Sequence, residues 1–418
     1  MKAVILAAGE GKRMRPLTYE RPKVMLPVAG KPLVEHLLEE VKEAGIDEFI
    51  FVVGYHDETI RDYFGEGERW GVDIQYVTQK TQLGTADALR KAEALVKGTD
   101  EFLMLNGDTI VSAEDIKRVS CISRSSEIAL GVIKVKNPED YGVIETEGEK
   151  ITKIHEKMKE PPSNLINAGV YLLNEPSIFE ALSKTAKSKR GEFELTDSLQ
   201  LLIEEGNNVF WKPIEHWVDV SYPWDLLAAN ELLMGETTFV LRRSVLDKTF
   251  KESLIEQNVS IKGDVSIGDN TVIKSGSYIE GPVVMGENSK IGPNCYIRAN
   301  TSIGDNCHIG SAVEIKNSII MDGTNIPHLS YVGDSVIGCR CNLGAGTKIA
   351  NLRFDDAPVK AKGLDLDTGM RKFGAIISDG VKTGINASID AGTIIGNNTL
   401  IGPGAFATGY IEKNSRIF

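Results

Sequence analysis

Aliphatic residues return at every sixth position through the second half of this 418-residue chain. Helices repeat every 3.6 residues and strands every two, so neither produces a six-residue period. Short parallel strands wound around a triangular prism do produce it, because each side of the prism needs one inward aliphatic side chain. Twelve consecutive positions carry the pattern: Ile255, Ile261, Ile267, Ile273, Ile279, Met285, Ile291, Ile297, Ile303, Ile309, Ile315 and Met321.

This hexapeptide pattern resembles the left-handed parallel β-helix. The period breaks near Pro327, resumes at Leu343, and returns for a last run that starts at Ile377. The charged stretch 351–373 lies between the two later runs, so we expect it to leave the prism as a loop. We therefore assign residues 253–418 to a β-helix domain and residues 236–252 to a linker.

The first 235 residues follow a different pattern, in which strand-like and helix-like segments alternate. We expect strands at 2–7, 49–53, 74–77 and 102–105, and helices at 33–44 and 85–96. This order is typical of an α/β domain with a Rossmann-like, mostly parallel sheet covered by helices. Residues 1–235 are therefore predicted to form one α/β domain.

The composition narrows the functional class. The formal net charge of −12 argues against a nucleic-acid-binding surface, which needs clustered basic residues. No segment approaches the ~20 apolar residues that span a membrane, and five scattered cysteines favour reduced thiols. We expect a cytoplasmic enzyme that acts on small molecules.

A glycine-rich segment follows the first predicted strand. Gly9 and Gly11 let backbone N–H groups approach phosphate oxygens, and Arg13 adds a fork of donors. By itself such a segment is equally an ordinary tight turn, since it lacks the Walker A pattern. The block that follows it contains Arg21-Pro22-Lys23 and Lys31-Pro32-Leu33.

The whole N-terminal block resembles the signature of sugar-phosphate nucleotidylyltransferases, and further motifs of that family follow in order. The resemblance implies that Arg13 and Lys23 act in catalysis on the nucleotide phosphates. It implies nucleotide binding by Gly9, Gly11, Arg13, Lys23, Gln79, Gly84 and Thr85. It implies sugar-phosphate binding by Gly142, Glu156, Lys157 and Asn167.

Asp108 and Asp219 match the family's two metal ligands, so the resemblance implies Mg²⁺. Taken alone, Asp108 in Asn-Gly-Asp would be a turn residue. The family joins a sugar 1-phosphate to a nucleoside triphosphate and releases pyrophosphate. Cations offset the repulsion between the two anions, and no covalent nucleophile is needed.

The β-helix half contains Val313-Glu-Ile-Lys316-Asn317, then His328-Leu-Ser-Tyr331, then Asn342-Leu-Gly-Ala-Gly-Thr347. These motifs resemble the acetyltransferase half of bifunctional N-acetylglucosamine-1-phosphate uridylyltransferases. The resemblance implies that His328 is the base for transfer from acetyl-CoA, since histidine accepts a proton near neutral pH. It also implies that Arg298 and Lys316 bind the sugar phosphate and that Tyr331 and Asn342 position the sugar. In the charged stretch 351–373 we expect Asn351 to contact acetyl-CoA and Lys360 to contact a phosphate or the substrate. Such sites lie between neighbouring subunits, so a homotrimer or a multiple of trimers is expected.

One motif departs from the bacterial enzymes, in which Asn-Tyr-Asp-Gly stands where Asn351-Leu-Arg-Phe stands here. The chain therefore looks more like the archaeal bifunctional type. Two alternatives stay open: a single-function nucleotidylyltransferase whose β-helix only assembles or regulates, and a non-catalytic regulatory subunit. The sequence does not decide between UTP with N-acetylglucosamine 1-phosphate and dTTP with glucose 1-phosphate.

Overall fold

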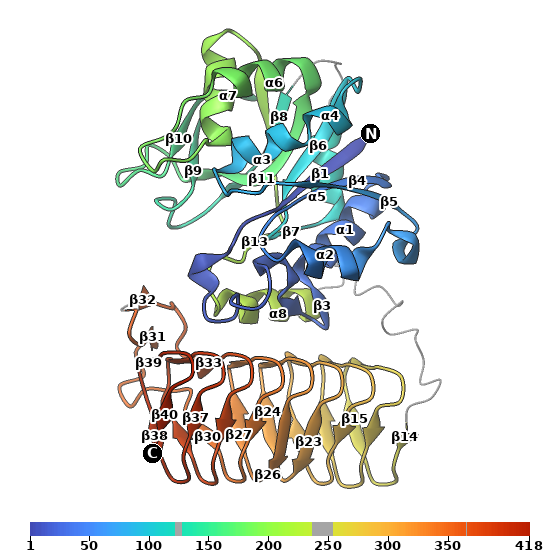
Figure 1. Ribbon diagram of the computed structural model, residues 1–418, viewed down its shortest axis with the longest axis vertical. Coiled ribbons are helices and arrows are strands. Elements are labelled where there is room, and N and C mark those ends of the chain that lie inside the picture. Colours follow the sequence, from blue (N-terminus) through green and yellow to red (C-terminus); the bar gives the residue numbers. More distant parts are fainter. Residues whose placement is uncertain (122–127, 236–253, 365) are drawn as a thin grey trace. The chain divides into compact units, whose positions relative to one another are not determined.

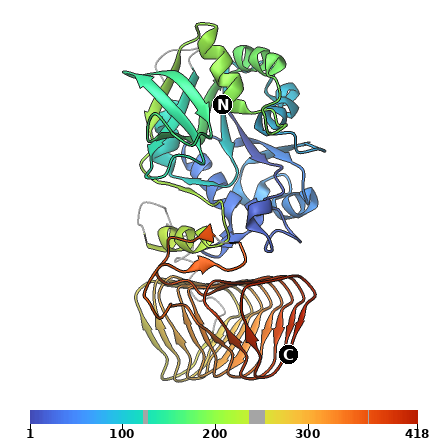
Figure 2. The same cartoon turned by 90° about the vertical axis from the view of Figure 1, so that its left-hand side faces the viewer.

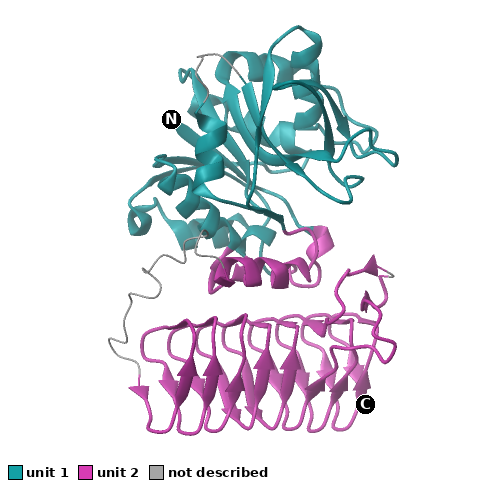
Figure 3. Cartoon of the chain, turned by 180° about the vertical axis from the view of Figure 1, so that it is seen from behind, with its two compact units in different colours: residues 1–11, 20–25, 33–219 teal, residues 12–19, 26–32, 220–418 magenta. Residues whose placement is uncertain are grey.

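The computed structural model describes residues 1–121, 128–235, 254–364 and 366–418. These residues form two compact units, shown in different colours in Figure 3. The first unit comprises residues 1–11, 20–25 and 33–219, and the second comprises 12–19, 26–32 and 220–418. The first unit and the expected domain 1–235 therefore differ at 12–19, 26–32 and 220–235, while the expected linker 236–252 lies outside the described residues.

A nine-stranded sheet organises the first unit, in the order β5-β4-β1-β6-β11-β8-β12-β10-β9 (Figure 1). Strands β5, β4, β1 and β6 run parallel, whereas β11 is antiparallel to β6 and β8. The strands are β1 (Lys2–Ala7), β4 (Glu48–Val53), β5 (Asp73–Thr78), β6 (Glu101–Asn106), β8 (Ile128–Lys134), β9 (Gly142–Glu147), β10 (Lys150–Glu156), β11 (Leu165–Asn174) and β12 (Val209–Pro213).

Helices cover both faces of this sheet because successive strand residues point to opposite sides. Alternate residues of β1 show the division: Ile5 packs with α1, α2 and α5, whereas Val4 packs with α3, α6 and α7. The helices are α1 (Leu33–Glu43), α2 (Asp57–Phe64), α3 (Thr85–Lys91), α4 (Glu93–Val96), α5 (Ala113–Ser120), α6 (Glu175–Lys184) and α7 (Leu195–Glu204). The structure thus confirms the predicted α/β domain, although the helix expected at 85–96 is divided at Ala92.

The second unit contains α8 (Asp225–Gly235), the short pair β2 (Pro27–Val28) and β3 (Lys31–Pro32), and three parallel sheets. The coils of these sheets stack along one axis (Figures 1 and 2). The first face holds β14 (Leu254–Ile255), β17 (Val272–Ile273), β20 (Lys290–Ile291), β23 (His308–Ser311), β26 (Asn325–His328), β29 (Asn342–Leu343), β34 (Lys382–Thr383), β37 (Leu400–Ile401) and β40 (Arg416–Ile417).

The other two faces complete the β-helix. The second face holds β15 (Ser260–Lys262), β18 (Tyr278–Glu280), β21 (Tyr296–Ile297), β24 (Glu314–Lys316), β27 (Tyr331–Gly333), β30 (Lys348–Ile349), β35 (Ser388–Ile389) and β38 (Phe406–Ala407). The third face holds β16 (Val265–Ile267), β19 (Val283–Met285), β22 (Thr301–Ile303), β25 (Ile319–Ile320), β28 (Val336–Ile337), β33 (Ala375–Ile377), β36 (Thr393–Ile395) and β39 (Tyr410–Ile411). The three-sided β-helix predicted from the six-residue period is confirmed.

The inward side chains form one continuous apolar core. Ile273, Ile297 and Ile309 are fully buried there, as the period requires. At many corners an asparagine adopts a positive φ, for example Asn270 and Asn306, because its short polar side chain tolerates this conformation. Ile255 in the first coil is half-exposed, since its strand lies at the edge of the first face.

The corner between the second and third faces corrects one residue of the predicted period. Ile303 pairs with Ile320 rather than with Met321, so the position counted as the twelfth repeat is wrong by one residue. Five residues separate Ile315 from Ile320, where six separate Ile297 from Ile303. The next coil is shortened at the same corner, between Val332 and Ile337.

The charged stretch 351–373 leaves the β-helix at this corner too, after β30 and before β33, as expected. It is more ordered than a plain loop, because β31 (Lys360–Ala361) and β32 (Leu366–Asp367) pair as a hairpin. Val359 and Ala361 are buried, and Lys362 forms an ion pair with Asp390. The stretch therefore folds back onto the last coils.

The described residues contain no membrane-spanning helix and no disulfide bond. Among the described helices, none is long and apolar enough to cross a membrane. The five cysteines all lie in the described ranges and form no disulfide, and three of them are buried in the β-helix. Their thiols therefore serve as small packing groups there.

Candidate functional site

The first cluster lies where β1 and β6 end next to each other. The Gly107 N–H donates to the Leu6 carbonyl at 2.9 Å, which ties the residue before Asp108 to the end of β1. The Lys23 Nζ lies 2.5 Å from an Asp108 carboxylate oxygen, and the lysine is buried. In parallel α/β sheets ligands bind at the carboxyl ends of strands, and this ion pair lies at such an edge.

Asp219 reaches the same edge through a two-stranded ribbon. Strand β7 (Thr109–Val111) pairs antiparallel with β13 (Trp217–Asp219), and Asp219 lies opposite Thr109. Asp108 directly precedes Thr109 in the chain. Because residues opposite each other in a ribbon have Cα atoms about 5 Å apart, both carboxylates belong to one end of the ribbon. The sequence prediction paired these two aspartates, and the structure brings them to the same place.

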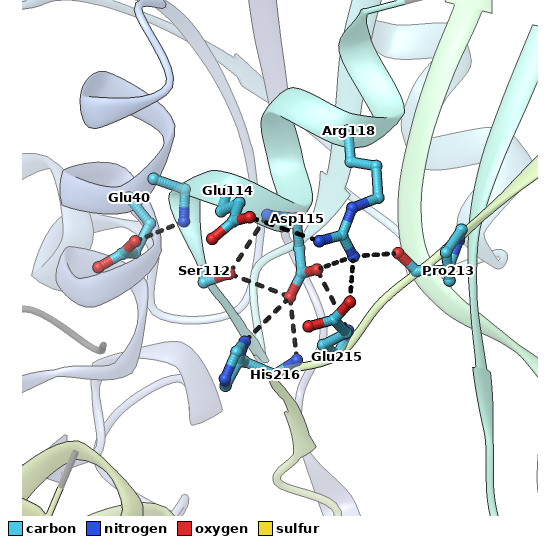
Figure 4. A network of polar contacts seen from close by, with 9 residues as sticks. Glu40, Ser112, Glu114, Asp115, Arg118, Pro213, Glu215 and His216 are labelled. Carbon is cyan, nitrogen blue, oxygen red and sulfur yellow. Dashed lines mark hydrogen bonds and ion pairs between the residues drawn. The ribbon is translucent and has the colours of Figure 1, made fainter. Parts of the chain in front are cut away.

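A buried carboxylate fixes the segment that carries Asp219 (Figure 4). Asp115 at the start of α5 accepts hydrogen bonds from the backbone N–H groups of Glu215 and His216, at 3.1 and 2.9 Å. Its oxygens also accept from Ser112 Oγ at 3.0 Å and from Arg118 Nη1 at 2.9 Å. Since β13 begins directly after His216, Asp115 anchors the ribbon to α5. Sequence reasoning missed this residue, because nothing local links positions 115 and 215.

Replacing Asp115 with alanine should lower the stability of the first unit by about 3 kcal/mol, because four donors lose the buried carboxylate that accepts their hydrogen bonds. Differential scanning calorimetry measures the change as a lower transition temperature. Glu114→Ala is the matched control, since its side chain is 76% exposed on the same helical turn. Equal melting of the two variants would contradict the anchoring role.

Arg13 and the glycine-rich turn are divided between the two units. Gly11, with a φ of 64°, ends the first segment of the first unit, and Gly9 is exposed. Arg13 belongs to the second unit, where its Nη2 donates to Ser221 Oγ at 3.1 Å. Its guanidinium lies over the Tyr222 ring, 5.3 Å from the centroid. The phosphate-binding roles of Gly9, Gly11 and Arg13 stay predictions.

The predicted nucleotide-binding segment is held in place by hydrogen bonds among its own residues and by contacts with Phe193 and Leu195. The Gln79 amide group donates to the Gly84 carbonyl at 3.1 Å and to Asp87 at 2.9 Å, so both of its N–H bonds are used within the protein. A Cβ at Gly84 would lie 2.4 Å from the Phe193 carbonyl, which makes glycine necessary. Thr85 Oγ1 accepts from the Leu195 N–H at 3.0 Å. These side chains shape the segment, and direct contact with a base stays a prediction.

The predicted sugar-phosphate residues largely converge. A Cβ built at Gly142 would lie 3.6 Å from a Glu156 oxygen and 3.7 Å from the Asn167 Cβ. Asn167 donates to the Tyr171 hydroxyl at 2.6 Å and accepts from the Gly169 N–H at 3.0 Å, so its amide is fixed. Lys157 is exposed just beyond β10, and its φ of 38° turns the chain there.

Sequence reasoning missed Arg190, which lies in the same cluster as Glu156. Its Nη2 lies 2.7 Å from Glu156 and 2.8 Å from Glu194, while Thr196 Oγ1 donates to Glu156 at 2.9 Å. Burial raises the pKa values of Glu194 and Asp197, and the nearby Glu156 charge adds to both shifts. Arg190 therefore holds together carboxylates that would otherwise repel. The Lys-Arg-Gly triplet was the only signal, and it resembles a surface turn.

Three residues predicted for the second site meet at the shortened corner of the β-helix. Lys316 forms an ion pair with Asp334 at 3.0 Å, and Asn351 Nδ2 donates to Asp334 at 2.5 Å. The same Asn351 nitrogen donates to the Tyr331 hydroxyl at 3.1 Å. Arg298 follows β21, one coil before Lys316, and its Nη1 lies 3.1 Å from a Glu314 oxygen.

The other predicted residues lie apart from this cluster. His328 ends β26 on the first face, is exposed, and precedes Tyr331 by one corner. Asn342 lies opposite Asn325, and Asn325 precedes His328 by three residues along β26. Lys360 lies in the hairpin of the 351–373 stretch. Within a single chain, the structure thus groups Lys316, Tyr331 and Asn351 but does not gather His328, Asn342 and Lys360 around Asp334.

Known proteins resemble both halves of the chain. The nucleotidyl transferase family matches residues 2–235, and the GMPPB C-terminal domain matches residues 279–382. A bifunctional protein GlmU of Methanococcus maripaludis is 47% identical, over 100% of this chain and 97% of its own length. A bifunctional sugar-1-phosphate nucleotidylyltransferase/acetyltransferase of Sulfurisphaera tokodaii is 43% identical, over 97% of this chain and 96% of its own.

Solved structures resemble the first half. A candidate glucose-1-phosphate thymidylyltransferase of Bacillus anthracis, crystallised with a sucrose, is 30% identical with a TM-score of 0.50. It covers 56% of this chain, and the match spans 94% of that protein. The chain belongs to the nucleotidyl transferase family and is related over its whole length to the archaeal bifunctional GlmU proteins.

Proposed function

We propose that this chain catalyses two reactions on sugar 1-phosphates. The first half transfers a nucleotidyl group from a nucleoside triphosphate and releases pyrophosphate. The β-helix half transfers an acetyl group from acetyl-CoA to the amine of glucosamine 1-phosphate. The observation that supports this most is the relationship along the entire chain to proteins described as bifunctional, at 47% identity. The preferred pair is UTP with N-acetylglucosamine 1-phosphate.

In the first reaction a sugar-phosphate oxygen forms a bond to the α-phosphorus while the bond to pyrophosphate breaks. Lys23 and Arg13 bind the phosphates in this proposal and lower the repulsion between them. The Lys23 ammonium is already oriented by Asp108 at 2.5 Å, so it needs little reorganisation when the anions arrive. Gly9 and Gly11 supply backbone donors.

The carboxylates at the end of the β7–β13 ribbon fit a magnesium ion. Mg²⁺ takes oxygen ligands and commonly uses one or two carboxylates together with substrate phosphates and water. Asp108 and Asp219 provide two carboxylates from one ribbon end, and the described residues hold no cluster of three or more metal-ligating side chains. When bound, the ion would supply charge neutralisation for the phosphates.

In the sugar pocket we assign Glu156 and Asn167 to the sugar hydroxyl groups and Lys157 to the phosphate. Glu156 keeps lone pairs beyond its bonds to Arg190 and Thr196, so it can also accept a hydroxyl donor. Gly142 leaves room beside them, because any side chain there would enter the space next to Glu156. Gln79, Gly84 and Thr85 form the base side of the pocket.

In the second reaction the amine attacks the thioester carbonyl, a C–N bond forms, and the C–S bond breaks to release CoA. His328 takes the proton of the attacking amine. We assign Arg298 and Lys316 to the sugar phosphate, and Tyr331 and Asn342 to the sugar. We assign Asn351 to acetyl-CoA and Lys360 to a phosphate or the substrate. Since these residues are not gathered within one chain, we propose a homotrimer, or a multiple of it, in which neighbouring chains complete each site. We place this enzyme in the cytoplasm.

A substrate panel tests both proposals in one preparation. Pyrophosphate is measured with UTP, dTTP and GTP against N-acetylglucosamine 1-phosphate and glucose 1-phosphate, and CoA is measured by chromatography with glucosamine 1-phosphate. The expected result is pyrophosphate from UTP with the N-acetylated sugar and CoA from the amino sugar. The second candidate, dTTP with glucose 1-phosphate, is favoured by the description of the Bacillus anthracis relative. If the protein releases pyrophosphate but no CoA, the second reaction is wrong and the β-helix serves only in assembly or regulation.

A further inference from the structure

Asp334 is a buried carboxylate for which the two proposed reactions provide no role. Its side chain is 3% exposed, and it follows β27 directly, with a φ of 50°. Its backbone N–H donates to the Lys316 carbonyl at 2.9 Å, which joins two successive coils. Burying a charge is costly unless partners compensate it, so its contacts explain why it is tolerated.

The Asp334 carboxylate accepts hydrogen bonds from the side chains of three residues. Lys316 Nζ donates to both Asp334 oxygens, at 3.0 and 3.2 Å. Asn317 Nδ2 donates to one oxygen at 2.8 Å, and Asn351 Nδ2 donates to the other at 2.5 Å. One carboxylate thus joins the end of β24, the end of β27 and the first residue of the 351–373 stretch.

The local backbone is built to allow this arrangement. Both coils are one residue shorter at this corner, and Asn317 and Asp334 each turn the chain with a positive φ. A Cβ at Gly333 would lie 2.6 Å from the Asn351 Nδ2 and 2.6 Å from the Tyr331 hydroxyl. A side chain at this position would displace the ends of Asn351 and Tyr331, so glycine lets these two side chains approach each other.

The Asn317 side chain gives a second observation about this cluster. Its Oδ1 is buried and accepts no hydrogen bond from the described residues. A buried acceptor without a partner is unfavourable, so the Asn317 amide is oriented by its donor bond to Asp334. Without Asp334, this amide would be free to rotate toward a better arrangement.

We propose that Asp334 is the positioning residue of the acetyl-transfer site. It holds Lys316 where this residue meets the sugar phosphate, and it holds Asn317 and Asn351, of which Asn351 contacts the Tyr331 hydroxyl. The proposal rests on the proposed second reaction. Asp334 does not touch substrate itself. It orients the Lys316 ammonium and, through Asn351, the Tyr331 hydroxyl.

Asp334→Asn is the sharpest test, because asparagine keeps the shape and removes the charge. Either orientation of the new amide places an NH₂ group against an existing N–H donor, since both oxygens now accept bonds. The KM for glucosamine 1-phosphate should rise about tenfold or more, as expected for losing one charge-assisted contact. Nucleotidyl transfer by the same preparation should stay within about twofold of the parent, because these contacts all lie in the second unit.

Asp379→Asn is the matched control, since Asp379 is an equally buried β-helix carboxylate that accepts from the Cys339 N–H at 2.8 Å. It should leave the acetyl-transfer KM unchanged. Combining Asp334→Asn with Lys316→Ala should raise KM by clearly less than the product of the two single effects, because the part of the Asp334 effect that acts through Lys316 is already lost in Lys316→Ala. A merely structural role would give additive effects and would affect both aspartate variants alike.

The outcomes are distinct. Unchanged acetyl-transfer kinetics in Asp334→Asn, equal losses in the two aspartate variants, or additive losses with Lys316→Ala would each overturn the positioning role. If Asp334→Asn does not fold, Asn317→Ala provides the test, and an unchanged KM there would overturn it too. A parent protein that releases no CoA with glucosamine 1-phosphate would refute the second reaction itself and, with it, this role.

Discussion

Replacing Lys23 with alanine is expected to lower the rate of nucleotidyl transfer by about 10³-fold or more, the range seen when a charge-stabilising group leaves a phosphoryl-transfer site. Two effects add. The phosphates lose a buried cation, and Asp108, which is 31% exposed, loses the ammonium 2.5 Å away. Its negative charge then repels the incoming polyphosphate. Initial rates of pyrophosphate release measure the effect.

Asp108→Asn tests the other half of the same pair and keeps the side-chain shape. It should raise the Mg²⁺ concentration needed for half-maximal rate, because a neutral amide is a weaker ligand for Mg²⁺ than a carboxylate. Lys184→Ala is the control for both variants, since Lys184 is a surface lysine that also pairs with carboxylates. If Lys23→Ala releases pyrophosphate at the parent rate, the Lys23–Asp108 pair takes no part in the reaction.

Replacing His328 with alanine is expected to lower acetyl transfer by about 10²–10⁴-fold, the usual contribution of a general base, and to leave pyrophosphate release intact. The histidine is exposed at the end of β26, so its loss should not disturb the core. CoA release and pyrophosphate release are measured on one preparation.

His308→Ala is the matched control on the same face, because β23 pairs with β26 and His308 lies opposite Asn325. Burial lowers the pKa of His308, and the nearby Lys274, Lys290 and His328 charges lower it further. His308 has no role in the proposed chemistry, so acetyl transfer should persist in its variant. Equal losses in both histidine variants would contradict the assignment of the base to His328.

The sequence predicted the architecture because both halves have strong periodic signals. The six-residue period follows directly from one inward side chain per side of the prism, and Ile273 and Ile309 are buried as it requires. The period could not reveal the shortened corner, because Ile320 and Met321 are adjacent, apolar and both buried. The inward one is decided by register between coils, which local sequence does not encode.

The site was predicted in part, and the parts that were missed share a cause. Lys23, Asp108 and Asp219 lie in short motifs, so they could be found without coordinates. Arg190 and Asp334 act on residues that are distant in the chain or on another coil, and such contacts arise only on folding. Short motifs therefore reported the residues proposed to touch substrate but not the residues that hold them.

The most direct test of two separate sites in one chain is to mix two single-site variants. Lys23→Ala and His328→Ala are purified separately and supplied with glucosamine 1-phosphate, acetyl-CoA and UTP. Neither alone should make the N-acetylated nucleotide sugar, whereas the mixture should make it, because the acetylated sugar phosphate diffuses from one protein to the other. No product from the mixture, with each variant retaining its remaining activity, would contradict the two-site account.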